Sequence, residues 1–245
     1  MPEPLKIDQQ QPPLTVAREL AADYVNAHAI FLAGSVIREE ATPTSDLDFV
    51  IVTEHDPAAP YRRSLMKGGW PVELFVHTPD SLEDFFASDI LRRRPSLPQM
   101  CAEALIVYQQ ESHGNRIKER AQQLLKKGPA PLSEADLYHQ RYLITDLLMD
   151  LEGSQVEAET LFIATRLAEC AADAYLAFHQ KWSGQGKWLF RALRASFAHK
   201  AEDLHRALHA CVADRNSAPL KSWVMDCLAE MGGPRFEGHY QQAPR

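Results

Sequence analysis

Apolar residues recur along the first half of the chain in short runs of the length of β-strands. Between these runs lie turns and two predicted helices. In the first, 14–26, apolar residues repeat at helical spacing. The second starts at Pro79-Asp80-Ser81 and runs to Ser88, and Ser81 with Asp84 fits a capping box at its start. Four runs have the length and composition of strands: 29–32, 46–52, 72–76 and 105–108. This alternation predicts a small mixed sheet flanked by helices.

The second half of the chain shows helical periodicity alone. Alanine- and leucine-rich stretches follow the turn at 128–131, and they predict an antiparallel helical bundle. These stretches are 133–151, 155–181, 187–213 and 217–231. The fold class is therefore α+β, with a sheet domain followed by an all-α domain. We expect three parts, namely a flexible leader rich in proline and glutamine (1–13), a sheet domain (14–114) and a helical domain (115–245).

Two aspartates open the second apolar run, and a Gly-Ser pair follows the first. In a strand, Asp46 and Asp48 point to the same face, because side chains at i and i+2 do so. Two adjacent carboxylates repel each other unless a cation lies between them, so the pair predicts a Mg²⁺ site. The turn at Gly34 and Ser35 offers backbone N–H groups and a hydroxyl, which suit a phosphate. Together these features indicate metal-assisted chemistry on a nucleoside triphosphate.

A third acid stands in the run 72–76. Glu73 is surrounded there by valine, leucine and phenylalanine, and burying an unpaired carboxylate is expensive. A place beside Asp46 and Asp48 would account for it. We therefore expect Glu73 to complete the carboxylate set.

These motifs resemble the nucleotidyltransferases of the DNA polymerase β superfamily, which include the bacterial aminoglycoside nucleotidyltransferases. The resemblance rests on Gly34-Ser35, on Arg38 and on the string SDLDFVIV that starts at Ser45. The segment 68–88 also resembles kanamycin nucleotidyltransferase. The family pattern runs strand, Gly-Ser, helix and then Asp-x-Asp on the next strand. One departure is Glu39, because many members have glycine after the arginine.

The resemblance implies an enzyme that moves a nucleoside monophosphate, AMP from ATP, to a hydroxyl of a small molecule and releases pyrophosphate. An aminoglycoside-like antibiotic is the expected acceptor. Two Mg²⁺ ions would be bound by Asp46 and Asp48, with Glu73 as a further ligand or as the base. The residues expected to contact the nucleotide are Gly34, Ser35, Arg38, Ser45 and, from the helical half, Lys187.

Several alternatives stay open at this point. The general base is Glu73 or an acid of the helical half; Asp146 and Asp150, spaced i, i+4 on one helix face, and Glu169 are the candidates. The second functional reading is a nucleotide-binding regulatory or toxin–antitoxin component, protein AMPylation included. A homodimer is compatible with either reading.

Composition narrows the class of protein. A net charge of −7 and a pI near 5.8 argue against generic nucleic-acid binding, which requires a basic surface. No apolar stretch reaches the length of a membrane span, and the N-terminus lacks a signal pattern, so we expect a cytoplasmic protein. The cysteines are widely spaced and are expected to be reduced thiols: Cys101, Cys170, Cys211 and Cys227.

Overall fold

The computed structural model describes residues 11–54 and 56–240, and the chain divides into two compact units between Lys127 and Gly128. Of the expected leader at 1–13, residues 1–10 lie outside the described residues. Pro13 already begins the first helix, α1 (Pro13–Ala22). The expected boundary after residue 114 is replaced by one after Lys127. The helix α4 (His113–Lys127) belongs to the first unit, because its apolar side packs against the sheet and against α3 (Ser96–Glu103).

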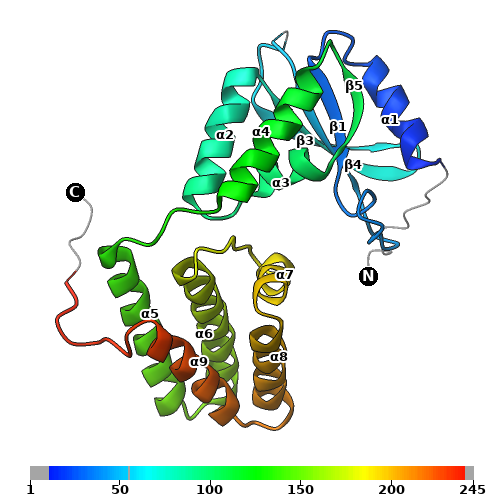
Figure 1. Ribbon diagram of the computed structural model, residues 1–245. Coiled ribbons are helices and arrows are strands. Elements are labelled where there is room, and N and C mark those ends of the chain that lie inside the picture. Colours follow the sequence, from blue (N-terminus) through cyan, green and yellow to red (C-terminus); the bar gives the residue numbers. More distant parts are fainter. Residues whose placement is uncertain (1–10, 55, 241–245) are drawn as a thin grey trace. The chain divides into compact units, whose positions relative to one another are not determined.

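The first unit is built on a mixed sheet, as the sequence predicted, but the sheet has five strands and not four (Figure 1). The strands lie in the order β3-β4-β2-β1-β5, and only the pair formed by β2 and β4 is parallel among them. Their bounds are β1 (Ala29–Ala33), β2 (Leu47–Val52), β3 (Tyr61–Lys67), β4 (Trp70–His77) and β5 (Leu105–Gln109).

The edge strand β3 and the helix α3 were not predicted. The sequence of β3 is mostly polar and its side chains are mostly exposed, so it lacks the apolar alternation of a half-buried strand. Lysine and arginine are common on edge strands, where they discourage pairing with another chain. A two-residue turn of Gly68 and Gly69, both with positive φ, joins β3 to β4.

Helices cover both faces of the sheet (Figure 1). Side chains of α1 pack with alternate residues of β2 and β4, such as Phe49 and Leu74. The opposite face packs against α2 (Pro79–Leu91), α3 and α4, through residues such as Val50 and Phe31. Because alternate residues of β2 face α1, Asp48 lies on the face that also carries Val50, beside the cover of α2, α3 and α4.

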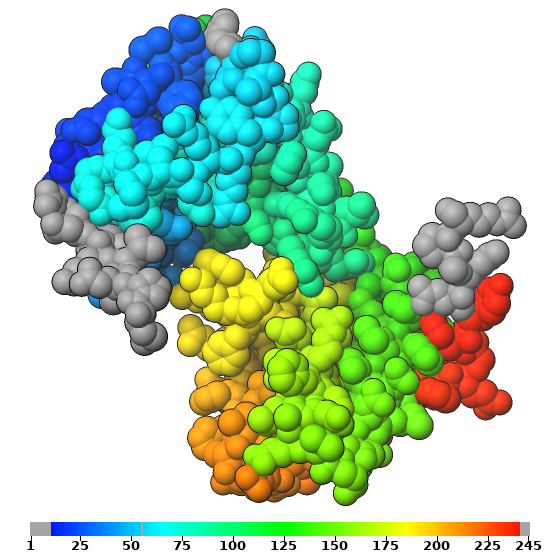
Figure 2. Space-filling model, turned by 180° about the vertical axis from the view of Figure 1, so that it is seen from behind, coloured from blue at the N-terminus to red at the C-terminus, as the bar shows by residue number. Residues whose placement is uncertain are grey.

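The second unit is entirely helical over its described residues, and this confirms the α+β fold class. One core joins its helices, and α6, α7 and α8 pack on one another (yellow-green to orange in Figure 2). The stretch 187–213, predicted as one helix, is two, because Phe197 leaves helical geometry (φ −146, ψ 71). Its ring lies 5.1 Å from that of Tyr175, measured between centroids. The helices are α5 (Glu134–Gly153), α6 (Glu157–Phe178), α7 (Lys187–Ser196), α8 (Ala198–Ala213) and α9 (Ala218–Glu230).

Two further sequence-based expectations concern cysteines and membranes. The four cysteines are free thiols, and Cys170 is the one that is only partly buried. Burial raises the pKa of the Cys227 thiol to about 12, so this group stays protonated. Among the described helices, none combines the length and the apolar character that a membrane crossing requires.

Candidate functional site

The pairing of β2 with β4 places the acids of the two strands side by side. In this parallel ladder Asp48 is the register partner of Glu73, and on its other side Asp48 pairs with Ala33 of β1. Asp46 stands one residue before β2 and faces the same way as Asp48. The apolar residues that alternate with them, such as Leu47, are buried in the core under α1. Strand alternation and the parallel register of β2 with β4 therefore place all three carboxylates at one end of the same sheet face.

The three carboxylates converge closely enough to share a cation. One oxygen from each of Asp46, Asp48 and Glu73 lies within 4.8 Å of the others, and all three side chains are partly buried. Carboxylate oxygens are the ligands that Mg²⁺ prefers in proteins. Three negative groups at this separation repel one another, and a divalent cation would remove that repulsion. The donor set thus fits a divalent metal ion.

Asp48, one of the three carboxyl groups, has a clearly shifted pKa. Its pKa is raised to about 6, first because the carboxyl group is buried and then because Asp46 and Glu73 are nearby. The guanidinium groups of Arg62 and Arg38 act in the opposite direction and lower it. The protein therefore maintains a carboxylate whose charged form is disfavoured, which is typical of a functional position.

The turn after β1 lies directly against Asp48. Gly34 has a φ of +86, and a Cβ atom at this position would lie 2.3 Å from Oδ2 of Asp48. Glycine is required here for two reasons, the positive φ and the missing side chain. The backbone of the turn and the Asp48 carboxylate therefore form one compact structure.

A hydroxyl network connects this turn to the segment before Asp46. Ser35 Oγ donates to Ser45 Oγ at 3.0 Å, and the backbone N–H of Thr42 donates to the same oxygen at 2.8 Å. The backbone N–H of Ser45 donates in turn to the Thr42 carbonyl at 3.0 Å. Ser45, which is buried, thus ties the turn at 42–45 to Ser35. The two serines predicted to contact the nucleotide are brought together.

The segment between Ser35 and Ser45 differs from the family pattern, because residues 35–39 form turns where that pattern has a helix. Glu39 has a φ of 58, in the left-handed region, at the position where the sequence departs from the family pattern described above. Glycine adopts this conformation without the steric penalty that a Cβ atom brings. The departure noted in the sequence thus leaves the turn intact but places a strained residue in it.

Replacing Glu39 by glycine is expected to raise the free energy of unfolding by about 0.5–1 kcal/mol, because the strain is relieved. Urea denaturation followed by circular dichroism measures the change. Glu39→Ala is the control, since it removes the carboxylate but keeps the Cβ atom. Equal stability of the two variants would show that backbone strain at this position is negligible.

Arg38 lies near the carboxylates but is engaged with other acids. Its Nη1 donates to Oε2 of Glu103 at 3.1 Å, and its Nε donates to Oε2 of Glu40 at 3.3 Å. Glu103 ends α3, so this ion pair connects the turn to the helical cover of the sheet. Arg38 is one of two cations that lower the pKa of Asp48, which places its charge within reach of the site.

The second cation, Arg62, was missed by sequence reasoning. It stands on β3, donates from Nη2 to Oε2 of Glu73, and holds its guanidinium carbon 4.8 Å from the centre of the Phe75 ring. The signal that could have revealed it is the pair Gly68-Gly69 between two strand-length segments, which is typical of a β-hairpin. Counting back from that turn would have placed Arg62 across from the strand of Glu73.

The remaining predicted residues belong to the second unit. Lys187 begins α7, is exposed, and has its Nζ 5.9 Å from the centre of the Trp188 ring. Asp146 on α5 is partly buried, whereas Asp150 on α5 and Glu169 on α6 are exposed. Their roles stay predictions.

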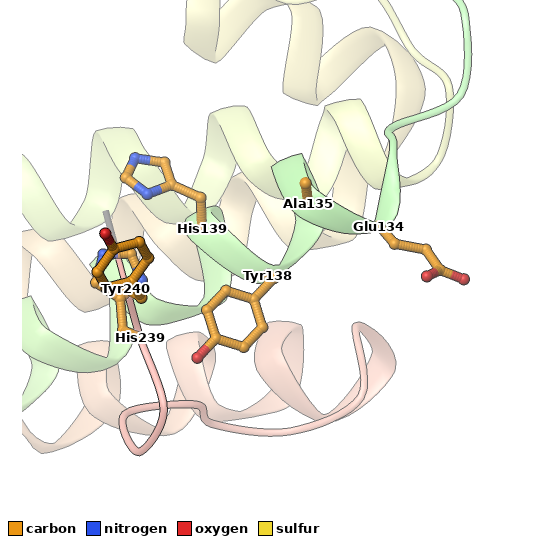
Figure 3. Close-up of a pocket in the computed structure, with 6 residues that line it drawn as sticks. All are labelled: Glu134, Ala135, Tyr138, His139, His239 and Tyr240. Atoms are coloured by element: carbon orange, nitrogen blue, oxygen red, sulfur yellow. The ribbon is translucent and has the colours of Figure 1, made fainter. Parts of the chain in front are cut away.

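The second unit also has a pocket of its own (Figure 3). It lies between the start of α5 and the segment that follows α9, where the rings of Tyr142 and His239 stack with centroids 3.6 Å apart. Its lining is mostly aromatic and contains no residue predicted for the nucleotide or the metal. The lining residues are Glu134, Ala135, Tyr138, His139, His239 and Tyr240.

A match to a protein-family model supports the assignment of a nucleotidyltransferase domain to the first unit. No curated protein matches the chain. A solved structure, that of a nucleotidyltransferase-like protein from Exiguobacterium sibiricum 255-15, is similar over 90% of this chain and 73% of that chain, with a TM-score of 0.42 and 12% sequence identity. Residues 15–97, which include the Gly34 turn and all three carboxylates, match the family described as "Nucleotidyltransferase domain", so the first unit carries a nucleotidyltransferase domain.

Proposed function

We propose that this protein transfers AMP from ATP to a hydroxyl of a small-molecule acceptor of the aminoglycoside kind, with release of pyrophosphate. The observation that carries the proposal is the meeting of Asp46, Asp48 and Glu73 within 4.8 Å of one another in a nucleotidyltransferase domain. A module that only binds a nucleotide has no need for three acids that repel one another. A catalyst that must hold divalent cations does need them.

Asp46, Asp48 and Glu73 are the residues that would hold two Mg²⁺ ions. When bound, such ions polarise the phosphate and lower the pKa of an attacking hydroxyl. The raised pKa of Asp48 supports this role, because a nearby divalent cation restores the charged form that burial disfavours.

The Gly34 turn is the proposed cradle for the terminal phosphates. Its backbone lies against Asp48, so a phosphate held there is next to the carboxylates. The Ser35 hydroxyl, which now donates to Ser45, can turn to donate to a phosphate oxygen, and Ser45 then keeps the turn in place. Arg38 offsets negative charge in this region, and Lys187 is proposed to supply a further cation.

In this proposal the helical unit binds the acceptor, and the base comes from either unit. Asp146 and Asp150 share one face of α5 and suit the ammonium groups of a polycationic acceptor. The proton of the acceptor hydroxyl passes to Glu73 or to one of the acids of the helical unit, Asp146, Asp150 or Glu169. The net charge of −7 favours a cationic acceptor over a nucleic acid.

Thermal melting with each nucleoside triphosphate, with and without Mg²⁺, tests the donor and metal parts of the proposal. ATP with Mg²⁺ at about 100 times its Kd is expected to raise the melting temperature by about 5–11 °C, because a ligand of the native state stabilises it by mass action. The double variant Asp46→Asn/Asp48→Asn should lose this shift. A wild-type protein that responds to no nucleotide contradicts the proposal.

Release of pyrophosphate tests the acceptor. With ATP, Mg²⁺ and a panel of aminoglycosides, wild-type protein is expected to release pyrophosphate only with an acceptor present. The alternative result is that no aminoglycoside supports pyrophosphate release but a protein becomes labelled by the α-phosphate of ATP. That result would identify a side-chain hydroxyl as the acceptor. Absence of release in both assays overturns the enzyme assignment.

A further inference from the structure

We infer that Arg62 competes with divalent metal for Glu73 and moves to the nucleotide phosphates when metal is bound. This inference rests on the metal role proposed for Asp46, Asp48 and Glu73. In this inference Arg62 exchanges its ion pair with Glu73 for contacts with the nucleotide phosphates. Neither the sequence pattern nor the family match singles this residue out.

The hairpin β3–β4 sets Arg62 on the side of the sheet that carries the acids. Arg62 is the register partner of Phe75, and Ser64 is the partner of Glu73. Register partners point to the same face, and Phe75 and Glu73, two residues apart, also share it. The guanidinium group therefore reaches Glu73 across the diagonal of the ladder, over the Phe75 ring.

Arg62 differs from Arg38 in the partners that it has. Arg38 is bound to Glu40 and Glu103, two acids outside the triad. The ion pair of Arg62 is with Glu73, a member of the triad itself. A metal ion that uses the Glu73 carboxylate therefore meets a positive charge already on that ligand, and like charges at this distance repel.

The surroundings of Arg62 allow the exchange. Its side chain is 59% exposed, whereas that of Glu73 is 23% exposed, so the arginine can leave while the carboxylate stays. Contact with the Phe75 ring keeps the guanidinium group near the carboxylates after Glu73 is released. A planar guanidinium group binds phosphate oxygens in a bidentate manner. The triphosphate of a bound nucleotide is therefore its new partner.

Strand β3 also supplies a matched control. Arg63 is the next residue, is exposed as well, and pairs with Leu74, so it points to the opposite face of the sheet. Among the described residues it forms no ion pair within 4.0 Å. Arg62→Gln and Arg63→Gln thus remove the same charge from neighbouring positions, one at the site and one away from it.

The test measures binding of Mn²⁺ alone and of ATP with Mg²⁺ in the absence of any acceptor, both by titration calorimetry. Arg62→Gln is expected to lower the Kd for Mn²⁺ about three- to tenfold, because the competing charge is gone. It is expected to raise the Kd for ATP with Mg²⁺ about tenfold, because a phosphate contact is lost. Arg63→Gln should change neither. Arg62→Lys should keep the wild-type Kd for Mn²⁺ but bind ATP less tightly, because lysine has the charge without the planar fork.

The outcomes separate this inference from the proposed function. Binding of Mn²⁺ to wild type but not to Asp48→Asn would support the metal site. If Arg62→Gln then leaves the Kd for Mn²⁺ unchanged or raises it, Arg62 only holds Glu73 in place, and the inference fails while the metal site stands. If wild-type protein does not bind Mn²⁺, both fail. Melting curves of the variants without ligand verify that each is folded.

Discussion

Replacing Asp48 by asparagine is expected to abolish pyrophosphate release and, in the absence of metal, to make the protein more stable. A loss of activity of about 10³-fold or more is expected because the variant removes a proposed metal ligand at the reacting phosphate. The gain in stability follows from the raised pKa of Asp48, about 6 against an ordinary value of 3.8. Folding disfavours the charge of this carboxyl group, and asparagine carries none.

The pH dependence of the stability gain has a definite sign. Because the pKa is higher in the folded state, the carboxyl group lowers stability in full above about pH 6, progressively less between pH 6 and pH 4, and not at all below that range. The advantage of Asp48→Asn is therefore expected to be about 3 kcal/mol at pH 7 and to fall below about 1 kcal/mol near pH 4. Urea denaturation in a chelating buffer at the two pH values measures it.

A control separates the site from general effects of removing a charge. Asp84 is an exposed acid on α2, and Asp84→Asn is expected to change neither pyrophosphate release nor stability by a measurable amount. An Asp48→Asn variant that keeps wild-type activity would remove Asp48 from the metal site. An Asp48→Asn variant that is less stable than wild type at pH 7 would show that neighbouring groups stabilise the charged Asp48 carboxylate in the metal-free protein.

Replacing Gly34 by alanine is the second change with a large expected effect. The new Cβ atom would fall 2.3 Å from Oδ2 of Asp48, and the backbone at φ +86 disfavours any side chain. The Asp48 carboxylate must then move away from its partners. We expect pyrophosphate release to fall at least 100-fold and the free energy of unfolding to fall by about 2–3 kcal/mol.

Gly233 offers a close control for this variant. Its φ is +85, almost that of Gly34, but a Cβ atom there would meet nothing within 4 Å. Gly233→Ala therefore carries the backbone strain without the collision and should lose about 1–2 kcal/mol of stability with activity unchanged. If the free energy of unfolding falls by the same amount in both variants and Gly34→Ala remains active, the close approach of the turn to Asp48 is not required for activity.

Local sequence patterns were sufficient for the main lines of the fold and for the acids. The apolar run of β1 is buried on both faces, that of β2 is nearly so, and β4 alternates between buried and partly buried residues, so all three leave a strong signal. An acid within such a run is conspicuous because burial of a charge requires compensation. For the same reason Asp46, Asp48 and Glu73 could be selected together, and the change from strand to helical periodicity predicted the second unit.

Patterns failed where packing, and not local periodicity, decides the structure. The strand β3 lies at the edge and is polar, so it carries no period-two signal, and Arg62 was lost with it. The helix α4 looks like a connection to the bundle in the sequence, but its apolar side completes the core of the sheet domain. The break at Phe197 divides a stretch whose helical periodicity is continuous.

The sequence by itself thus determined which residue types this protein can bring to a nucleotide: a glycine turn, two aspartates on one strand and a glutamate on another. The tertiary structure alone decided that these groups meet, because the parallel register that pairs Asp48 with Glu73 joins strands that are not adjacent in sequence. The tertiary structure also decided which cation lies beside the carboxylates, since Arg62 reaches Glu73 only through the pairing of β3 with β4. Contacts between distant segments depend on register and packing, and neither leaves a trace in local periodicity.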